Sequence, residues 1–282
     1  MSASKAPDLG VEWWTRGAAR DDVAAHEASR LNLLTCELRA DVNQAMTLIP
    51  HTPENFDKPL ELIRRAQEIE QGFLDWEASL PDEWRFNTVA WADTIPDSDL
   101  SISEVYPGKV DMFSDLFVAS QWNMARVARL ILSGIIIRCA ACICAPVDYR
   151  TTSHYAQASR IGIEMINDIV ASIPYHLGWR GFRNNSEDNL TTGNISSFVC
   201  GQNEIGTGKP LGAYFLIWPV FTSIVSDFAT DAQRKYIVGR MKYMTDIMGI
   251  NGAAVLTQVY LFHSHITFLL SIPLSTYVIQ PS

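Results

Sequence analysis

The chain has 282 residues, of which 48% are hydrophobic and 19% are charged, and its formal net charge at pH 7 is −9. This composition supports a substantial buried core in one or two domains and excludes a chain that is disordered throughout. Residues 51–115 hold 15 acidic and 5 basic residues. Because such a surface repels phosphates, we expect no direct contact with nucleic acid and no DNA-binding residue.

Residues 1–20 show little pattern and are predicted to be disordered or frayed. A helical domain is predicted for residues 21–256, with a first helix at about residues 21–48. The clearest helical pattern lies in residues 60–79, where apolar residues recur at intervals of three and four and so share one helical face. These residues are Leu62, Ala66, Ile69, Phe73 and Trp76. They predict an amphipathic helix that packs against a core.

The next segment, residues 80–110, is rich in proline and scattered acidic residues and is predicted to be an irregular, exposed connector. A long helix is predicted from about Asp111 to Cys144. A shorter helix is predicted over residues 153–172, ending before Pro174. No alternation of apolar and polar residues is long enough to predict a strand.

Residues 180–210 are polar and predict a loop. The apolar segment 211–228 contains Pro219, which should kink or split a helix there. Thr230 and Gln233 fit a capping box, T-x-x-Q, at the start of a further helix. Taken in order, these elements predict an all-α fold, an irregular multi-helix bundle.

The last part of the chain, residues 257–282, is an apolar tail without Asp, Glu, Lys or Arg. A membrane-spanning helix needs about 20 consecutive apolar residues, and polar residues interrupt residues 253–279 too often for that. We therefore expect no membrane span. The tail should be a helix that closes the core or a segment that packs on a protein partner.

Two groups of residues have side chains that can bind metals, but their spacing in the sequence does not fit a metal site. Cys139, Cys142 and Cys144 lie on different sides of a predicted helix and have no second cysteine pair nearby, as structural zinc sites commonly do. His263 and His265 have no carboxylate or cysteine close in the sequence. We therefore expect no metal site and no cofactor, and no sequence motif of a catalytic site occurs.

Four residues within the long predicted helix form the candidate binding site of the chain: Trp122, Asn123, Arg126 and Arg129. The two arginines are one helical turn apart, beside an aromatic and an amide side chain. One interpretation is a pocket for an anion or a small effector inside the bundle. The other is structural, with the arginine stems packed along the helix and their charges paired with the acidic region 51–115.

Four stretches of sequence resemble those of a known family: FLDWEASLPDEW at 73–84, WNMARVARLIL at 122–132, IVASIPYHLG at 169–178 and LGAYFLIWP at 211–219. Their order resembles the C-terminal regulatory region of fungal binuclear zinc-cluster transcription factors, over residues 60–256. The resemblance implies an all-helical regulatory domain in the nucleus. Such a domain would act through protein partners, related transcription factors or a small-molecule effector.

The chain departs from the family pattern because it contains no array of the type C-x2-C-x6-C, which belongs to the six-cysteine zinc cluster that binds DNA. We therefore expect a regulatory protein without a DNA-binding module of its own, and not an enzyme. The alternative is an enzyme of secondary metabolism that reuses the helical scaffold around a pocket with few polar groups. A third alternative, membrane association, rests on the uncharged tail, and a cytoplasmic location is the alternative to the nucleus.

Overall fold

The computed structural model describes residues 22–48, 56–92, 99–178 and 208–271. They form seven α-helices, two short 3₁₀ helices and one two-stranded sheet, so the prediction of an all-α, multi-helix fold is confirmed. The α-helices are α2 (Val23–Leu48), α3 (Asp57–Ser79), α4 (Leu116–Cys144), α5 (Ser153–Leu177), α6 (Gly208–Ile224), α7 (Asp231–Asp246) and α8 (Asn251–Ser271).

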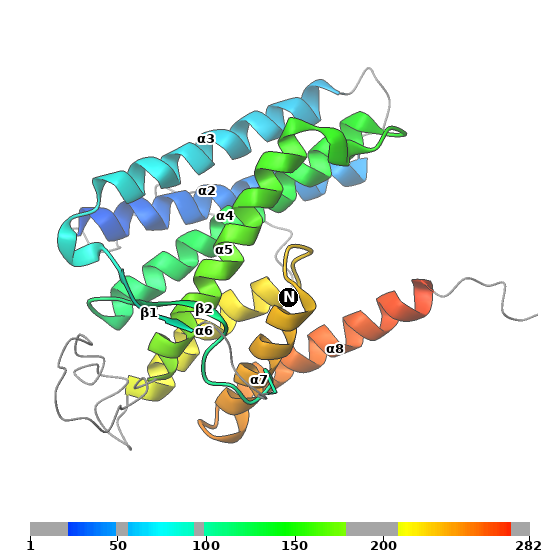
Figure 1. The fold of residues 1–282 in the computed structure, drawn as a ribbon. Coiled ribbons are helices and arrows are strands. Elements are labelled where there is room, and N and C mark those ends of the chain that lie inside the picture. Colours follow the sequence, from blue (N-terminus) through cyan, green and yellow to red (C-terminus); the bar gives the residue numbers. More distant parts are fainter. Residues whose placement is uncertain (1–21, 49–55, 93–98, 179–207, 272–282) are drawn as a thin grey trace, which may run out of the picture.

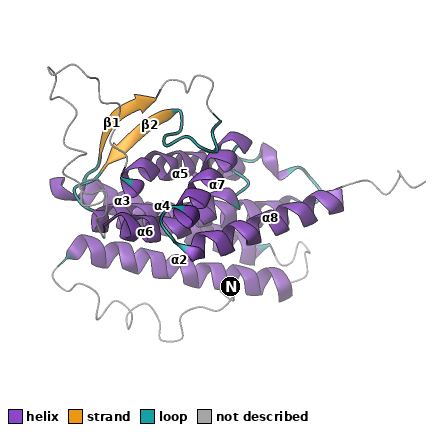
Figure 2. Ribbon diagram, turned by 90° about the horizontal axis from the view of Figure 1, so that it is seen from below, coloured by secondary structure: helices purple, strands orange, loops and turns teal. Residues whose placement is uncertain are grey.

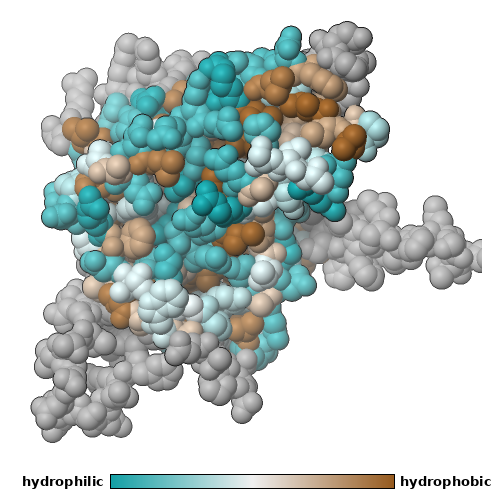
Figure 3. Space-filling view, turned by 45° about the horizontal axis from the view of Figure 1, so that its top comes forward, coloured by the Kyte–Doolittle hydropathy of each residue, from teal (hydrophilic) through white to brown (hydrophobic). Residues whose placement is uncertain are grey.

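Helix α4 is the central element of the fold. Helices α2 and α3 pack against it on one side, and α5 and α6 pack against it on the other (Figure 1). Helix α7 joins α6 to α8, and α8 extends away from the rest of the helices (Figures 1 and 2). The surface shown in Figure 3 is mostly hydrophilic, with separate hydrophobic patches between the polar side chains.

Two clusters of buried apolar side chains hold these helices together, and α4 contributes to both. The first cluster joins α2, α3 and α4, and includes Leu31, Phe73 and Trp122. The second joins α5 to α8 and receives Val127 and Leu130 from α4. Both sides of α4 are therefore covered by other helices, which explains why its sequence is apolar almost all round.

The predictions for α3 and α7 are confirmed. All five apolar residues of the α3 stripe are buried in the first cluster. In the capping box of α7, the Gln233 backbone N–H donates to Thr230 Oγ1 at 3.2 Å, and the Thr230 N–H donates to Gln233 Oε1 at 2.9 Å. Gly249 follows α7 with φ of 72°, a left-handed conformation that glycine adopts without steric cost.

The prediction of an irregular connector over 80–110 is wrong in part. Asp82–Trp84 form a 3₁₀ helix, η2, and β1 (Asn87–Ala92) pairs antiparallel with β2 (Gly108–Met112) on one face of the helical body (Figure 2). The strand pattern is hard to detect because a bulge interrupts it between Thr88 and Ala90.

The long helix therefore begins later than predicted. Asp111 belongs to β2, where its carboxylate accepts a hydrogen bond from Thr88 Oγ1 at 2.8 Å. Helix α4 starts at Leu116, after Asp115 at the N-cap position. The Asp115 carboxylate accepts from the backbone N–H of Val118 at 2.8 Å, as N-cap side chains do.

Pro174 does not end a helix as predicted, and Pro219 does not split one. Helix α5 continues past Pro174 to Leu177 and ends at Gly178, whose φ is 77°. Helix α6 runs through Pro219 to Ile224 without a split, and the remainder of the predicted segment, 225–228, is a turn. Both prolines are buried, so apolar packing offsets the backbone hydrogen bond that each proline removes.

Helix α8 crosses the boundary that the sequence suggests between the domain and its tail at residue 257. Ala253 is buried in the second cluster, and Leu256 and Tyr260 pack against that cluster. Val259 and Phe262, on other faces of α8, are exposed. The side chains of His263 and His265 lie outside the described residues, as do residues 1–20 and most of the predicted loop 180–210.

By length and composition, α4 could also cross a membrane. Half of its most apolar stretch is buried by the other helices, and the core helices of soluble proteins have the same composition. Among the described residues, no three His, Cys, Asp or Glu side chains are close enough to hold a metal ion. Three of the described cysteines are free thiols: Cys36, Cys139 and Cys144.

Candidate effector site

Trp122 belongs to an aromatic cluster between α3, α4 and the hairpin. Its ring centroid lies 5.1 Å from that of Trp76 and 4.9 Å from that of Phe86. Its indole N–H donates to the carbonyl oxygen of Trp84 at 2.7 Å. A buried tryptophan needs such a partner, so this contact fixes the residues that lead from η2 into β1.

Asn123 lies in a fully buried polar network between α4 and α5. Its Nδ2 lies 2.9 Å from Ser172 Oγ and 3.1 Å from His176 Nε2. The other ring nitrogen, Nδ1, lies 3.1 Å from the carbonyl oxygen of Gly212 in α6. Burial lowers the pKa of His176 to about 4, so the ring is neutral. Because the Gly212 carbonyl oxygen can only accept, Nδ1 donates to it, and Nε2 accepts from the Asn123 amide. This network connects three helices and holds His176 in one tautomer.

Arg126 is buried, with 2% of its surface exposed. Its Nη1 donates to Asn123 Oδ1 at 3.1 Å and to the backbone carbonyl of Asp168 at 3.2 Å. Its Nε and Nη2 make no hydrogen bond within the described residues. They lie 3.9 Å from an Asp168 carboxylate oxygen and 3.8 Å from an Asp111 carboxylate oxygen. Burial lowers the pKa of the guanidinium, and the two carboxylates oppose that shift.

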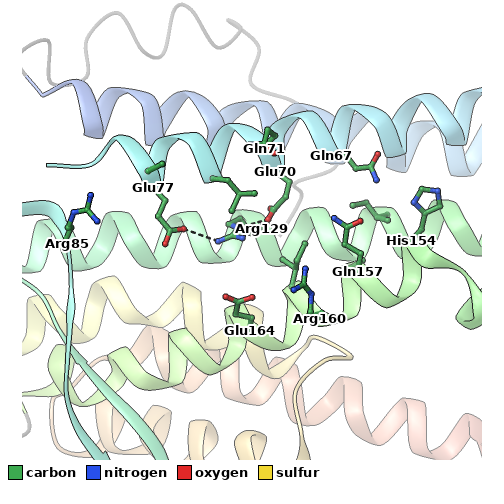
Figure 4. A pocket seen from close by; sticks show the side chains of 15 residues that line it. Gln67, Glu70, Gln71, Glu77, Arg85, Arg129, His154, Gln157, Arg160 and Glu164 are labelled. Carbon is green, nitrogen blue, oxygen red and sulfur yellow. Dashed lines mark hydrogen bonds and ion pairs between the residues drawn. The ribbon is translucent and has the colours of Figure 1, made fainter. Parts of the chain in front are cut away.

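Arg129 points away from this buried layer toward α3. Its Nε and Nη2 donate to Glu70 Oε1 at 2.9 and 2.8 Å, and its Nη1 lies 3.7 Å from a Glu77 carboxylate oxygen (Figure 4). The predicted ion pair between an arginine of this helix and the acidic region 51–115 is therefore confirmed for Arg129. Burial acts to lower the pKa of Arg129, but the hydrogen bonds that Arg129 donates to Glu70 outweigh it, so the pKa is raised.

The structure divides the four predicted site residues between two environments. Trp122, Arg126 and Arg129 line a cavity of about 40 Å³, whereas Asn123 does not. Glu77, Arg129 and Glu164 line both this inner cavity and a larger groove outside it. The inner cavity therefore adjoins the larger groove, and Arg126 lines the inner cavity but not the groove.

The larger groove, called here the α3–α5 groove, has a volume of about 700 Å³. It lies between α3 and α5, and α4, which runs between these two helices, also lines it (Figure 4). Leu74, Ile136 and Ile161 contribute apolar surface to it. Polar side chains from α3, α4 and α5 surround that surface: Gln67, Glu70, Gln71, Glu77, Arg129, His154, Gln157, Arg160 and Glu164. A volume of this size is typical of small-molecule sites.

Glu70 is the best-defined acceptor in the groove. The residue is 8% exposed, and its Oε2 has no hydrogen-bond partner within the described residues, although its Oε1 is bonded to Arg129. A buried carboxylate oxygen without a partner is energetically costly, so a ligand that donates a hydrogen bond to it would gain affinity.

Sequence reasoning found Arg129 and missed the residues that α3 and α5 contribute. One signal was available for Glu70, which is an acidic residue between the apolar Ile69 and Phe73 on the buried side of α3. For Arg160 and Glu164 the sequence gives only helical spacing on α5. Which helix lies opposite them depends on tertiary packing, which the spacing does not reveal.

The fold and the groove define an all-helical domain with a polar, ligand-sized groove beside its central helix. The chain is similar to Transcription factor dbaG of Emericella nidulans, with 27% identity over 213 residues, which cover 74% of this chain and 46% of that protein. The chain thus spans about half the length of this curated relative. No family model matches the chain, and no solved structure matches it. The chain is related to a fungal transcription factor.

Proposed function

We propose that this chain is a regulatory domain of the type found in fungal zinc-cluster transcription factors, and that it acts in the nucleus. The observation that carries the proposal is the similarity to Transcription factor dbaG over most of the chain. The acidic surplus of residues 51–115 supports a role that depends on protein or effector contacts instead of contacts with DNA. No observation on the described residues favours the alternative of an enzyme.

We further propose that the α3–α5 groove is the effector site. Glu70 Oε2 would accept a hydrogen bond from the effector, and the amides of Gln67 and Gln157 offer both donors and acceptors. Leu74 and Ile161 would contact an apolar part of the molecule. Because acidic and basic side chains are nearly balanced in the groove, the expected effector is a neutral compound with hydroxyl groups on an apolar body.

The regulatory role can be tested by fusing the full chain to an unrelated DNA-binding module in a yeast reporter strain. The fusion should change transcription at least about threefold relative to the DNA-binding module alone. An unchanged reporter, with the fusion expressed and bound at its operator, would rule out the regulatory role.

The groove can be tested in the same assay with two exposed glutamines. Gln71→Trp places a large side chain in the groove, whereas Gln44→Trp places one on α2, outside the groove. We expect Gln71→Trp to reduce the transcriptional effect and Gln44→Trp to leave it unchanged. If the two variants have the same transcriptional effect, the regulatory role does not depend on the groove, and the proposed effector site is wrong.

A further inference from the structure

A second cavity lies on the opposite side of α4 from the α3–α5 groove. It has a volume of about 720 Å³ and lies between α4, α6 and the turn 225–228. One residue of α2, one residue of α5 and the 3₁₀ helix η3 (Tyr149–Thr151) also line it. We call it the α4–α6 pocket. No residue of the pocket lines the α3–α5 groove, so the two cavities are separate.

The walls of the α4–α6 pocket are apolar and aromatic. The ring centroids of Trp218 and Phe221, on α6, lie 5.9 Å apart with an angle of 36° between the ring planes. The rings of Tyr149 and Tyr155 pack edge to face, with centroids 5.7 Å apart. Leu130 contributes buried aliphatic surface from α4. Aromatic walls of this kind favour a flat apolar ligand.

The charges that line the pocket are mostly positive. Three arginines, Arg39, Arg138 and Arg150, line it together with one acidic residue, Asp227. Arg138 Nη1 donates to the neutral Asn43 Oδ1 at 3.0 Å, and the Arg150 guanidinium lies 5.9 Å from the Tyr149 ring centroid. In the α3–α5 groove, by contrast, Arg129 is neutralised by Glu70 and Glu77. Guanidinium groups bind carboxylates through paired hydrogen bonds, so this pocket suits an anion.

Gly134 leaves space at the surface of α4 within this pocket. A Cβ atom built on Gly134 would meet no atom within 4 Å. A larger residue here would occupy the pocket without a clash at its first carbon. Glycine in the middle of a helix is intrinsically unfavourable, so its presence in α4 is consistent with a need for free volume at this point.

We propose that the α4–α6 pocket binds an organic anion with a flat apolar body, of the class of aromatic carboxylates. The carboxylate would lie at the arginine rim, and the ring system would lie between Trp218, Phe221 and the two tyrosines. This binding activity is distinct from the effector site proposed for the α3–α5 groove, since the pocket lies on other residues and selects a charged ligand.

Isothermal titration calorimetry of the full chain tests this proposal with two matched probes. Anthracene-2-carboxylate carries the charge, and 2-(hydroxymethyl)anthracene is its neutral counterpart. We expect the carboxylate to bind at least about tenfold more tightly than the alcohol, because only the anion forms charge-assisted hydrogen bonds. Equal affinities would overturn the proposal.

Variants then locate the binding site. Gly134→Phe should abolish binding of anthracene-2-carboxylate, and Gly134→Ala, which adds only one carbon, should keep it. Arg39→Gln combined with Arg150→Gln should weaken binding about tenfold, whereas Arg64→Gln, on the exposed face of α3, should not. If Gly134→Phe fails to fold, the affinity of the Arg39→Gln, Arg150→Gln double variant for the probe tests the proposed site instead. Unchanged binding in the arginine pair or in a folded Gly134→Phe variant would contradict the proposed site.

The groove variant Gln71→Trp separates this proposal from the proposed function. It should leave the affinity for anthracene-2-carboxylate unchanged. If Gln71→Trp abolishes probe binding, the anion occupies the α3–α5 groove and the assignment to the α4–α6 pocket is wrong.

Discussion

Arg126 illustrates how a single residue can have a role other than the one that its sequence context suggests. In the sequence it stands beside Arg129 as half of a candidate anion site. In the structure it is enclosed by Phe86, Phe113 and Trp122, whose ring centroids lie 5.0 to 5.6 Å from its guanidinium carbon. Lys109, 2.8 Å from an Asp168 carboxylate oxygen and 3.3 Å from one of Asp111, completes the charged layer.

We predict that Arg126→Met lowers the free energy of unfolding by about 3 kcal/mol, because it leaves the fully buried Asp111 carboxylate with less compensation. Urea denaturation at pH 7 measures the change. Adding Asp111→Asn to Arg126→Met removes the buried charge and should restore at least about 1 kcal/mol. A loss below about 1 kcal/mol in the single variant would show that Arg126 is not electrostatically coupled to this layer.

The buried His176 predicts a pH dependence of stability. Its pKa is about 4 in the folded chain and 6.5 in the unfolded chain, so between these values the unfolded state binds the additional proton. The contribution of His176 to the free energy of unfolding is therefore fully present above pH 6.5. It decreases by up to about 3 kcal/mol as the pH falls toward 4. Urea denaturation of the parent chain and of His176→Gln at several pH values isolates this effect. The parent should lose more stability than the variant across that range, and parallel curves would refute the assignment.

At the scale of elements, two glycines in helices predict opposite effects of the same substitution. In α7, a Cβ on Gly239 would lie 1.9 Å from the backbone oxygen of Ser101, so α7 could not keep its position against the turn at 99–102. In α4, a Cβ on Gly134 would meet open space. The difference is one of tertiary packing, since alanine is the better helix former at both positions.

We predict that Gly239→Ala destabilises the fold by about 2 kcal/mol or more through overpacking. Gly134→Ala should stabilise it by about 0.5 to 1 kcal/mol through helix propensity. Thermal unfolding of the two variants under the same conditions compares them directly. A gain of stability in Gly239→Ala would mean that α7 does not approach Ser101 as closely as the structure shows.

The N-terminal cap of α7 gives a smaller expected effect. Thr230→Ala removes the hydroxyl that accepts from the Gln233 N–H, and we predict a loss of about 1 kcal/mol. Thr230→Ser keeps an acceptor at the same position and should lose less than half of that amount. Chemical denaturation of both variants provides the measurement, and similar losses would show that the methyl group matters more than the cap.

Some elements of this fold are encoded locally in the sequence, and others depend on distant residues. The stripe of α3 and the cap of α7 are encoded within one or two helical turns, so their residues alone predict them. The hairpin is different, because β1 and β2 are short and pair across intervening residues. The continuation of α5 past Pro174 could not be predicted from the local sequence either, because the buried neighbours that keep α5 helical come from other elements. Likewise, Arg129 could be nominated from the sequence, but its partner Glu70 lies on another helix and is identified only by the fold.

At the scale of the whole molecule, the net charge of −9 leads to a prediction about DNA. We predict that the chain binds a duplex with a dissociation constant weaker than about 100 μM at 150 mM salt, because a nonspecific protein–DNA contact requires a basic surface. Fluorescence anisotropy with a labelled duplex measures this. Tight duplex binding at that salt concentration would contradict the expectation that the chain acts without contacting DNA.

Because α4 supplies one side to each apolar cluster, its position in the chain has a consequence for synthesis on the ribosome. When α4 emerges, α2 and α3 are already available to cover one of its sides. On the other side, Val127 and Leu130 stay exposed until α5 and α6 have been translated. During that interval, the hydrophobic face of α4 in the nascent chain is exposed to solvent. This is the stage at which we expect a chaperone to bind the chain.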